Sequence, residues 1–261
     1  MSAESSLRLV EPAMGTVFSF DVRTPATDEI HAALTSAVAW LHHVDALFST
    51  YRPGSQISRL GRGELTVGEC APEVREVLDR CRELSEETGG RFSSTPAGRL
   101  DPSGLVKGWA VERASDLLYE AGALDHCVNG GGDVQTRGEA APGRPWRIGL
   151  AHPADHEAVA AVVEGRDLAV ATSGTAERGA HITDPRTGRP ASALLSLTLV
   201  GRRLATVDAL ATAVFAMGEE AEDWLRSRPG LHAYAVTADH RVWSTPGFPF
   251  AAPLGAPCHA V

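Results

Sequence analysis

A loop that turns into a helix is written in residues 101–114, Asp101-Pro102-Ser103-Gly104-Leu105-Val106-Lys107-Gly108-Trp109-Ala110-Val111-Glu112-Arg113-Ala114. The segment opens with residue types that start helices, because Asp and Ser side chains accept backbone N–H groups and Pro presets φ. Gly122 suits the left-handed conformation that ends many helices. In between, apolar residues recur at helical spacing, at Ala110, Ala114, Leu117, Leu118 and Ala121. The segment therefore predicts a helix that ends at Gly122.

The start of this helix carries charges of both signs. Asp101 and Lys107 flank a Gly-Leu-Val segment, so an acid and a base sit beside exposed backbone groups. Free N–H groups and the helix dipole both favour an anion at a helix start, and a nearby lysine suits a phosphate. The alternatives from this segment alone are a phosphate site and a capped surface helix whose Lys107 is solvated.

Strands and helices are mixed on both sides of this segment. Upstream, strands are predicted at 7–10 and 17–22, with a tight apolar turn at 13–16 between them, and helices at 27–48 and from Pro72 to Gly89. Downstream, a helix is predicted from an Asp208 cap to Met217. The downstream strands are predicted at 125–128, 134–136, 146–150, 159–163, 168–171, 195–200, 233–237 and 242–244.

The chain has no repeat period and no clean linker, so we expect a single α+β unit of mixed strands and helices. Residues 1–12 are assigned to an N-terminal tail and first strand. Residues 13–248 form the predicted domain, and residues 249–261, rich in Pro and Gly, form an irregular C-terminal tail.

Composition excludes several classes of protein. With 43% hydrophobic residues in 261, the chain can build a sizeable core and is not globally disordered. A net charge of -9 argues against a nucleic-acid partner, which would require a basic face. The four cysteines are too sparse for a disulfide framework, which favours a reduced compartment. The sequence shows neither a secretory signal nor a membrane anchor, so we expect a cytoplasmic protein.

Two polar residues in the C-terminal half of the chain are candidate metal ligands. Asp208 and Thr212 are four residues apart and share one helix face, and both offer the hard oxygen ligands that Mg²⁺ prefers. The alternative is an Asp208 helix cap with Thr212 bonded back to the Asp208 carbonyl. His181, close to Asp184, could act as a base or a phosphate partner, or simply pack. The glycines at 130–132 lack the full dinucleotide-binding pattern, so no Rossmann fold is predicted.

Seven short segments follow one another along the chain, and their combination in this order is specific to one family. They are Met14-Gly15-Thr16, Ser49-Thr50-Tyr51-Arg52-Pro53-Gly54-Ser55, Asp101 to Lys107-Gly108, Val128-Asn129-Gly130-Gly131-Gly132-Asp133, Val170-Ala171-Thr172-Ser173-Gly174, His181-Ile182-Thr183-Asp184-Pro185-Arg186-Thr187-Gly188-Arg189-Pro190 and Asp208-Ala209-Leu210-Ala211-Thr212-Ala213. In this order they resemble the ApbE-like family, the FAD:protein FMN transferases. The resemblance runs from about Met14 to Met217, most of the chain.

The resemblance implies a fold, an activity and a set of site residues. It implies a single ApbE-like unit that transfers the FMN half of FAD to a Thr or Ser hydroxyl of an acceptor flavoprotein, releases AMP and uses Mg²⁺. The FAD contacts that it implies are Met14, Tyr51, Asp101, Lys107 and Ile182. The magnesium site that it implies consists of the Gly104 carbonyl, Asp208, the Ala211 backbone and Thr212.

Elementary chemistry agrees with these implied roles. Cleavage of a pyrophosphate builds charge on its oxygens, which a metal ion and Lys107 would stabilise. Tyr51 offers a flat face on which a ring can stack. The acceptor hydroxyl needs a base, for which His181 is the candidate by motif and Asp208 is the rival.

One segment departs from the family pattern. Family members usually have Phe-Asp-Pro-Thr and a longer insert before the lysine motif, whereas this chain has Phe92-Ser93-Ser94-Thr95 and a short insert. An acidic group is absent there, which bears on FAD contacts and on the shape of the target-binding surface. The alternatives to a transferase are an FAD pyrophosphatase, with water as the acceptor, and a non-catalytic FAD-binding protein.

Overall fold

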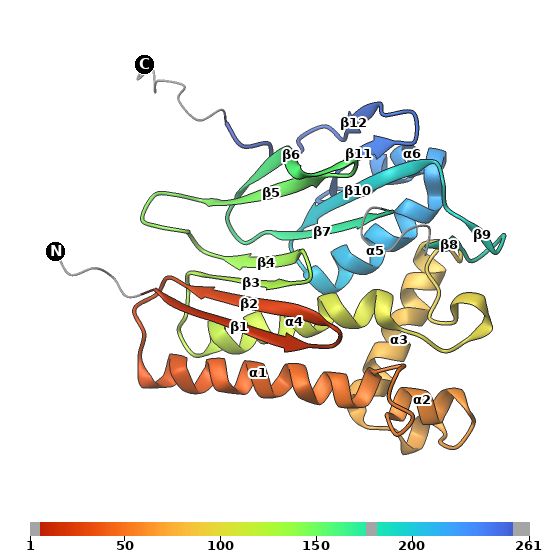
Figure 1. Ribbon diagram of the computed structural model, residues 1–261, viewed down its shortest axis with the longest axis horizontal. Coiled ribbons are helices and arrows are strands. Elements are labelled where there is room, and N and C mark those ends of the chain that lie inside the picture. Colours follow the sequence, from red (N-terminus) through yellow and green to blue (C-terminus); the bar gives the residue numbers. More distant parts are fainter. Residues whose placement is uncertain (1–5, 176–181, 253–261) are drawn as a thin grey trace.

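The computed structural model describes residues 6–175 and 182–252. Within these residues, eight strands form one antiparallel sheet in the order β1-β2-β3-β4-β7-β10-β11-β12 (Figure 1). The strands of this sheet are β1 (Leu7–Ala13), β2 (Thr16–Val22), β3 (His126–Gly130), β4 (Asp133–Arg137), β7 (Ala169–Gly174), β10 (Leu194–Gly201), β11 (His232–Thr237) and β12 (Val242–Ser244).

Helices cover one face of this sheet (Figure 1). α4 (Ser103–Glu120) lies on β3 and β4, and α5 (Leu204–Met217) lies on β7 and β10, while α1 (Asp28–Phe48) packs against α4 from outside. The remaining helices are α2 (Gln56–Gly61), α3 (Pro72–Glu87) and α6 (Ala221–Arg226), with short 3₁₀ turns η1 (Val67–Glu69), η2 (Pro96–Gly98) and η3 (Gly218–Glu220). The predicted α+β class is confirmed.

The middle of the sheet is buried on both faces. In β7, Ala169 and Ala171 join the core beneath the helices, whereas Val170 between them faces the opposite side. That opposite side is covered by a hairpin of β5 (Trp146–His152) and β6 (Asp155–Gly165), which contributes Leu150 and Val163 to a second apolar cluster. A two-residue pair, β8 (Thr183–Asp184) and β9 (Arg189–Pro190), lies apart from the main sheet.

The boundaries of most predicted elements agree with the structure to within a few residues, and one helix start does not. α4 ends as expected, with Gly122 in the left-handed region at φ 89°. The prediction that Asp208 caps a helix is wrong, because α5 begins at Leu204 and Asp208 lies inside it. The first N–H groups of α5 are accepted by side chains from elsewhere in the chain. The Leu204 amide donates to Gln135 Oε1 at 3.1 Å and the Ala205 amide to Glu112 Oε2 at 3.0 Å.

Both ends of the described chain are tied to strands. β1 pairs with β2 from Leu7 to Ala13, one residue beyond the boundary drawn from the sequence. At the other end, the Glu164 amide donates to the Pro249 carbonyl and the Ala251 amide to the Val162 carbonyl, so residues 249–251 run beside β6. Among the described residues, none of the helices combines the length and the apolar character needed to cross a lipid bilayer.

Candidate active site

The crossing of α4 over α5 brings the two helices into backbone contact at Gly108. A Cβ atom placed on Gly108 would lie 2.6 Å from the Asp208 Cβ and 2.6 Å from the Leu204 carbonyl oxygen, so a glycine is required. The Gly108 amide donates to Asp208 Oδ2 at 2.9 Å. Lys107, the neighbour of this glycine, is thereby carried to the same place as Asp208.

Lys107 lies between two acidic side chains. Its Nζ forms an ion pair with Asp133 at the start of β4 and lies 3.7 Å from Asp208 Oδ2. Asp133 and Asp208 are only 2% and 6% exposed. Burial raises the pKa of the Asp208 carboxyl, and the charge of Lys107 and the Gly108 amide oppose that rise. Two buried carboxylates thus share a single ammonium group.

Oxygen atoms of the kind that bind magnesium gather beside this cluster. A Cβ on Gly104 would lie 3.9 Å from Thr212 Oγ1, so the first turn of α4 faces Thr212 on α5. The Thr212 hydroxyl donates to the Asp208 carbonyl at 3.4 Å, the back-bond that the sequence alternative expected. In a regular α-helix the Gly108 amide donates to the Gly104 carbonyl, whereas in this structure the Gly108 amide donates to Asp208 Oδ2.

These atoms form a donor set of carboxylate, hydroxyl and backbone carbonyl, which fits Mg²⁺. Both described contacts of the Asp208 carboxylate use Oδ2. Ala211 is fully buried, and because its side chain is a methyl group, only its backbone could contribute an oxygen. In the described part of the chain, no cluster of three or more His, Cys, Asp or Glu side chains gathers to hold a metal. A cation here would depend on the mixed oxygen set.

The other predicted FAD contacts lie on separate elements. Met14 occupies the β1–β2 turn with φ 52° and packs partly on the core, as does Ile182 just before β8. Asp101 accepts the Ser103 amide at 3.0 Å, which fixes the start of α4. Tyr51 is 95% exposed after α1. Among these four residues, all of them described, no hydrogen bond or ion pair is formed. His181 lies outside the described residues.

The glycine turn between β3 and β4 places Asp133. Gly131 and Gly132 have φ of 58° and 93°, which favours glycine at both positions. A Cβ on Gly131 would lie 2.6 Å from Thr16 Oγ1, so this turn sits against the first residue of β2, beside the Met14 turn. Asp133 was not among the predicted site residues. The signal was its place directly after three glycines in a segment of the family resemblance, where the interpretation used only the glycines.

Comparison with known proteins identifies the family. The ApbE family profile matches residues 14–97 and 93–235, which is most of the chain. The chain belongs to the ApbE family. A relative from Vibrio cholerae, named FAD:protein FMN transferase, is 27% identical over 274 residues, covering 82% of this chain and 82% of the relative. A relative of the same name from Rhodobacter capsulatus is 37% identical over 220 residues, covering 80% of this chain and 39% of the relative.

Solved ApbE structures have the same fold. The ApbE protein of Thermotoga maritima superimposes with a TM-score of 0.83 at 22% identity, covering 94% of this chain and 98% of that one. The flavin transferase ApbE of Vibrio cholerae also gives 0.83, at 24% identity, covering 95% of this chain and 99% of that one. The prediction of an ApbE-like transferase is confirmed at the level of the family, since the relatives from Vibrio cholerae and Rhodobacter capsulatus are named FAD:protein FMN transferase.

The segment Phe92–Thr95, which departs from the expected motif, packs against the first turn of α4. Phe92 is 2% exposed, and a Cβ on Gly104 would lie 3.3 Å from its ring, so the phenylalanine packs under the first turn of α4. The Ser94 carbonyl accepts the Asp101 amide at 2.7 Å. Ser93 accepts the Thr95 amide at 3.0 Å through its hydroxyl, a local bond that an aspartate could also make. In this chain the segment packs against α4 through Phe92 and carries no acidic side chain.

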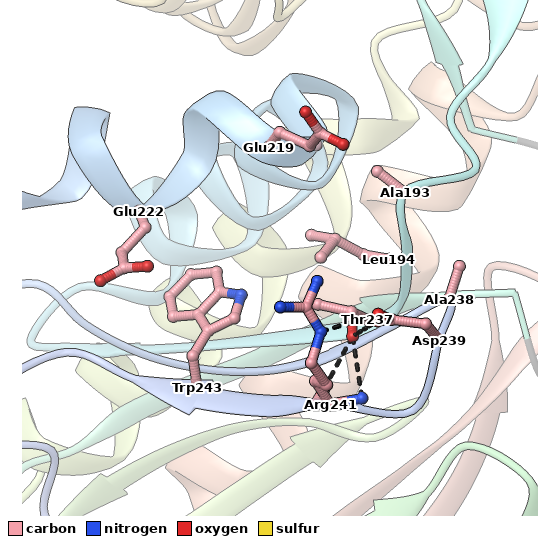
Figure 2. A pocket seen from close by; sticks show the side chains of 10 residues that line it. Ala193, Leu194, Glu219, Glu222, Thr237, Ala238, Asp239, Arg241 and Trp243 are labelled. Carbon is pink, nitrogen blue, oxygen red and sulfur yellow. Dashed lines mark hydrogen bonds and ion pairs between the residues drawn. The ribbon is translucent and has the colours of Figure 1, made fainter.

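A surface hollow of about 250 Å³ lies away from this cluster, between η3 and the β11–β12 turn (Figure 2). Figure 2 shows the Arg241 side chain beside Trp243 and below Leu194, with Glu219 and Glu222 in the upper part of the view. Arg241 is bound by its neighbour Asp239 at 2.7 Å. None of the predicted site residues lines this hollow, so it is separate from the Lys107–Asp208 cluster.

Proposed function

We propose that this chain is an FAD:protein FMN transferase that moves FMN from FAD to a Thr or Ser hydroxyl of an acceptor flavoprotein, with release of AMP and dependence on Mg²⁺. Membership of the ApbE family and the names of the relatives support this function. The observation that carries it is the meeting of α4 and α5, where Lys107 and Asp208 stand 3.7 Å apart beside Gly104 and Thr212.

The magnesium site of this proposal consists of Asp208, Thr212, the Gly104 carbonyl and the Ala211 backbone. When bound, the metal would neutralise charge on the phosphate oxygens. The oxygen donors described above are of the right chemical type, and a compact mixed set suits an ion that keeps some of its water. Burial of Asp208 places its charge in a weakly screened environment, where it attracts a cation strongly.

The FAD site of this proposal takes Met14, Tyr51, Asp101, Lys107 and Ile182. Lys107 supplies positive charge toward the pyrophosphate, and Tyr51, being 95% exposed, has a free ring face for stacking. In the transfer step, the acceptor oxygen forms a bond to the phosphorus of the FMN half. The bond from that phosphorus to the bridging oxygen breaks, and AMP leaves with the electron pair. His181 accepts the proton of the acceptor hydroxyl, with Asp208 as the rival base.

The test of this function combines product analysis with one variant. The protein is incubated with FAD and Mg²⁺, with and without a candidate acceptor, and AMP, free FMN and the acceptor mass are measured. A transferase adds the mass of FMN to the acceptor, and an acceptor whose target Thr or Ser is replaced by Ala stays unmodified. Free FMN and AMP at the same rate without acceptor would identify a pyrophosphatase. Absence of AMP in every arm would leave a flavin-binding protein.

Asp208→Ala separates the metal from the rest of the site. We expect it to lower turnover by at least about 10²-fold while FAD binding changes little, because the metal serves the phosphoryl step more than the rings. Chelation of Mg²⁺ in the wild-type enzyme should give the same loss. Full turnover in Asp208→Ala, or in excess chelator, would contradict the metal assignment.

The role of His181 is tested by the pH–rate profile. A positioned base contributes about 10²–10⁴ in rate, and its protonation sets the acidic limb of the profile. His181→Gln should therefore lose most of the rate and the acidic limb together. Weaker FAD binding with an unchanged profile would instead assign His181 to a phosphate contact. Near wild-type turnover at saturating FAD would move the role of base to Asp208.

We also propose a cytoplasmic location, which the free thiols of Cys70, Cys81 and Cys127 support, because a reducing compartment keeps cysteines in that form. Cell fractionation with an antibody against the full chain tests this. Recovery in a membrane or exported fraction would overturn it.

A further inference from the structure

Asp133 is the buried acid of the site to which neither the motif resemblance nor the proposed mechanism gives a role. Its Oδ1 accepts the Thr172 amide of β7 at 3.1 Å, so the sheet fixes its carboxylate. Its Oδ2 forms the ion pair with Lys107. With 2% of its surface exposed, Asp133 has little freedom to turn away.

The Lys107 ammonium lies closer to Asp133 than to Asp208. It contacts Asp133 directly and remains 3.7 Å from Asp208 Oδ2. An ammonium group moved onto Asp208 would occupy the carboxylate and repel a cation bound there. The lysine side chain is flexible, with a single charge on a long stem, so its position depends on what holds it.

We propose that Asp133 is a positioning residue, which anchors the Lys107 ammonium so that Asp208 stays open to the metal ion. The inference rests on the metal site proposed above. Groups that orient metal ligands from outside typically change metal affinity by about 10–100-fold when they are removed. Asp133 holds Lys107, which is not a ligand, away from the ligand Asp208, and we expect an effect of similar size without direct contact between Asp133 and the cation.

The expected consequence of Asp133→Asn is a loss of metal affinity that depends on Lys107. The asparagine keeps an oxygen for the Thr172 amide but replaces the second carboxylate oxygen with an N–H donor, which cannot accept from an ammonium. Lys107 is then drawn to Asp208, the other acid within reach. Metal affinity should fall about 10-fold or more.

The experiment is a double-mutant cycle read by Mn²⁺ binding, in which free Mn²⁺ is counted by electron paramagnetic resonance without FAD. Wild type, Asp133→Asn, Lys107→Met and the double variant are compared, each with its melting temperature. We expect the large loss in Asp133→Asn to shrink to about 3-fold or less in the Lys107→Met background, where no ammonium can be redirected.

The outcomes separate this inference from the proposed function. Equal loss in both backgrounds would mean that Asp133 acts by its own charge or by structure, and would overturn the positioning role. Wild-type affinity in Asp133→Asn would overturn it as well. If wild type itself binds no Mn²⁺, the metal site of the proposed function fails, and the inference fails with it. Should Asp133→Asn not fold, Asp133→Ser, which also removes the charge, takes its place in the cycle.

Discussion

Gly108 shows how much a single absent side chain decides. The 2.6 Å approach to the Leu204 carbonyl leaves no room for a methyl group, and backbone atoms cannot rotate aside as a long side chain can. Gly108→Ala should push α4 from α5, with a cost of about 1–3 kcal/mol in unfolding free energy and a loss of turnover. Urea unfolding measures the first. Gly68→Ala is the control, because the nearest atom to its Cβ would lie at 4.0 Å. Equal stability of the two variants would contradict this.

His126 makes stability depend on pH. The ring is fully buried, with Nδ1 2.6 Å from the Ala123 carbonyl and Nε2 2.7 Å from the Ser115 hydroxyl. Nδ1–H donates to the carbonyl and Nε2 accepts from the hydroxyl, a neutral tautomer. Burial lowers the pKa of His126 from 6.5 to about 4. The unfolded chain therefore binds the proton more tightly, and stability is lost as the pH falls from 6.5 toward 4.

The size of this loss is about 3 kcal/mol by pH 4, since each unit of pKa difference corresponds to about 1.4 kcal/mol. Urea unfolding between pH 7.5 and 4 measures it, with His126→Asn as the comparison, because Asn retains an N–H donor for the carbonyl. The difference in slope between the two proteins isolates His126 from other groups. Identical slopes in wild type and His126→Asn would rule out this role.

At the scale of elements, α5 is held by caps that come from other elements. Glu112 on α4 is 5% exposed and accepts the Ala205 amide, and Gln135 on β4 accepts the Leu204 amide. The negative carboxylate also suits the positive end of the helix dipole. Because α5 carries Asp208 and Thr212, these caps fix where the two side chains lie relative to α4 and the sheet.

Removal of the acidic cap should therefore be costly. Glu112→Ala leaves the partly buried Ala205 N–H without its acceptor and removes the ion pair with Arg203, so we expect a loss of about 1–3 kcal/mol in unfolding free energy. Glu112→Gln keeps an acceptor oxygen and should lose less. Thermal and urea unfolding check both, with Glu120→Ala, an exposed position on the same helix that pairs with Arg113, as the control. A loss in Glu112→Ala no larger than in the control would contradict the capping role.

At the scale of the whole molecule, the five proposed FAD contacts come from four segments far apart in the sequence. A ligand that binds them together would join the β1–β2 turn, the turn after α1, both ends of the Asp101–Lys107 segment and Ile182 just before β8. Such a ligand binds the native state and not the unfolded chain, so it adds stability by mass action.

FAD at about 100 times its dissociation constant should add about 2.7 kcal/mol and raise the melting temperature by several degrees. Differential scanning calorimetry measures the shift, and a titration gives the heat of binding. Tyr51→Ala, at a 95% exposed side chain, should leave the melting temperature without ligand unchanged and reduce the FAD-induced shift. Saturating FAD with neither a thermal shift nor heat would refute the FAD site.

The sequence by itself determined the parts of this protein that depend on local pattern. Helical spacing and a closing glycine locate α4, because neighbouring residues supply both the apolar face and the end of the helix. Alternation of apolar and polar residues locates β2, and a short apolar run locates β7. Ordered motifs indicate the family, and the family profile confirms it. Lys107, Gly104, Asp208 and Thr212, predicted from motifs, prove to be neighbours.

Only the tertiary structure decided the features that join distant residues. The start of α5 could not be predicted from the sequence, because its first N–H groups donate to Gln135 and Glu112, which are far from Leu204 in the chain. Asp133 was not predicted as a site residue because its ion pair with Lys107 forms only when α4 and β4 pack together. A pattern reports what a residue does with its near neighbours. Burial, caps and shared charges depend on partners that meet only when the sheet and helices pack.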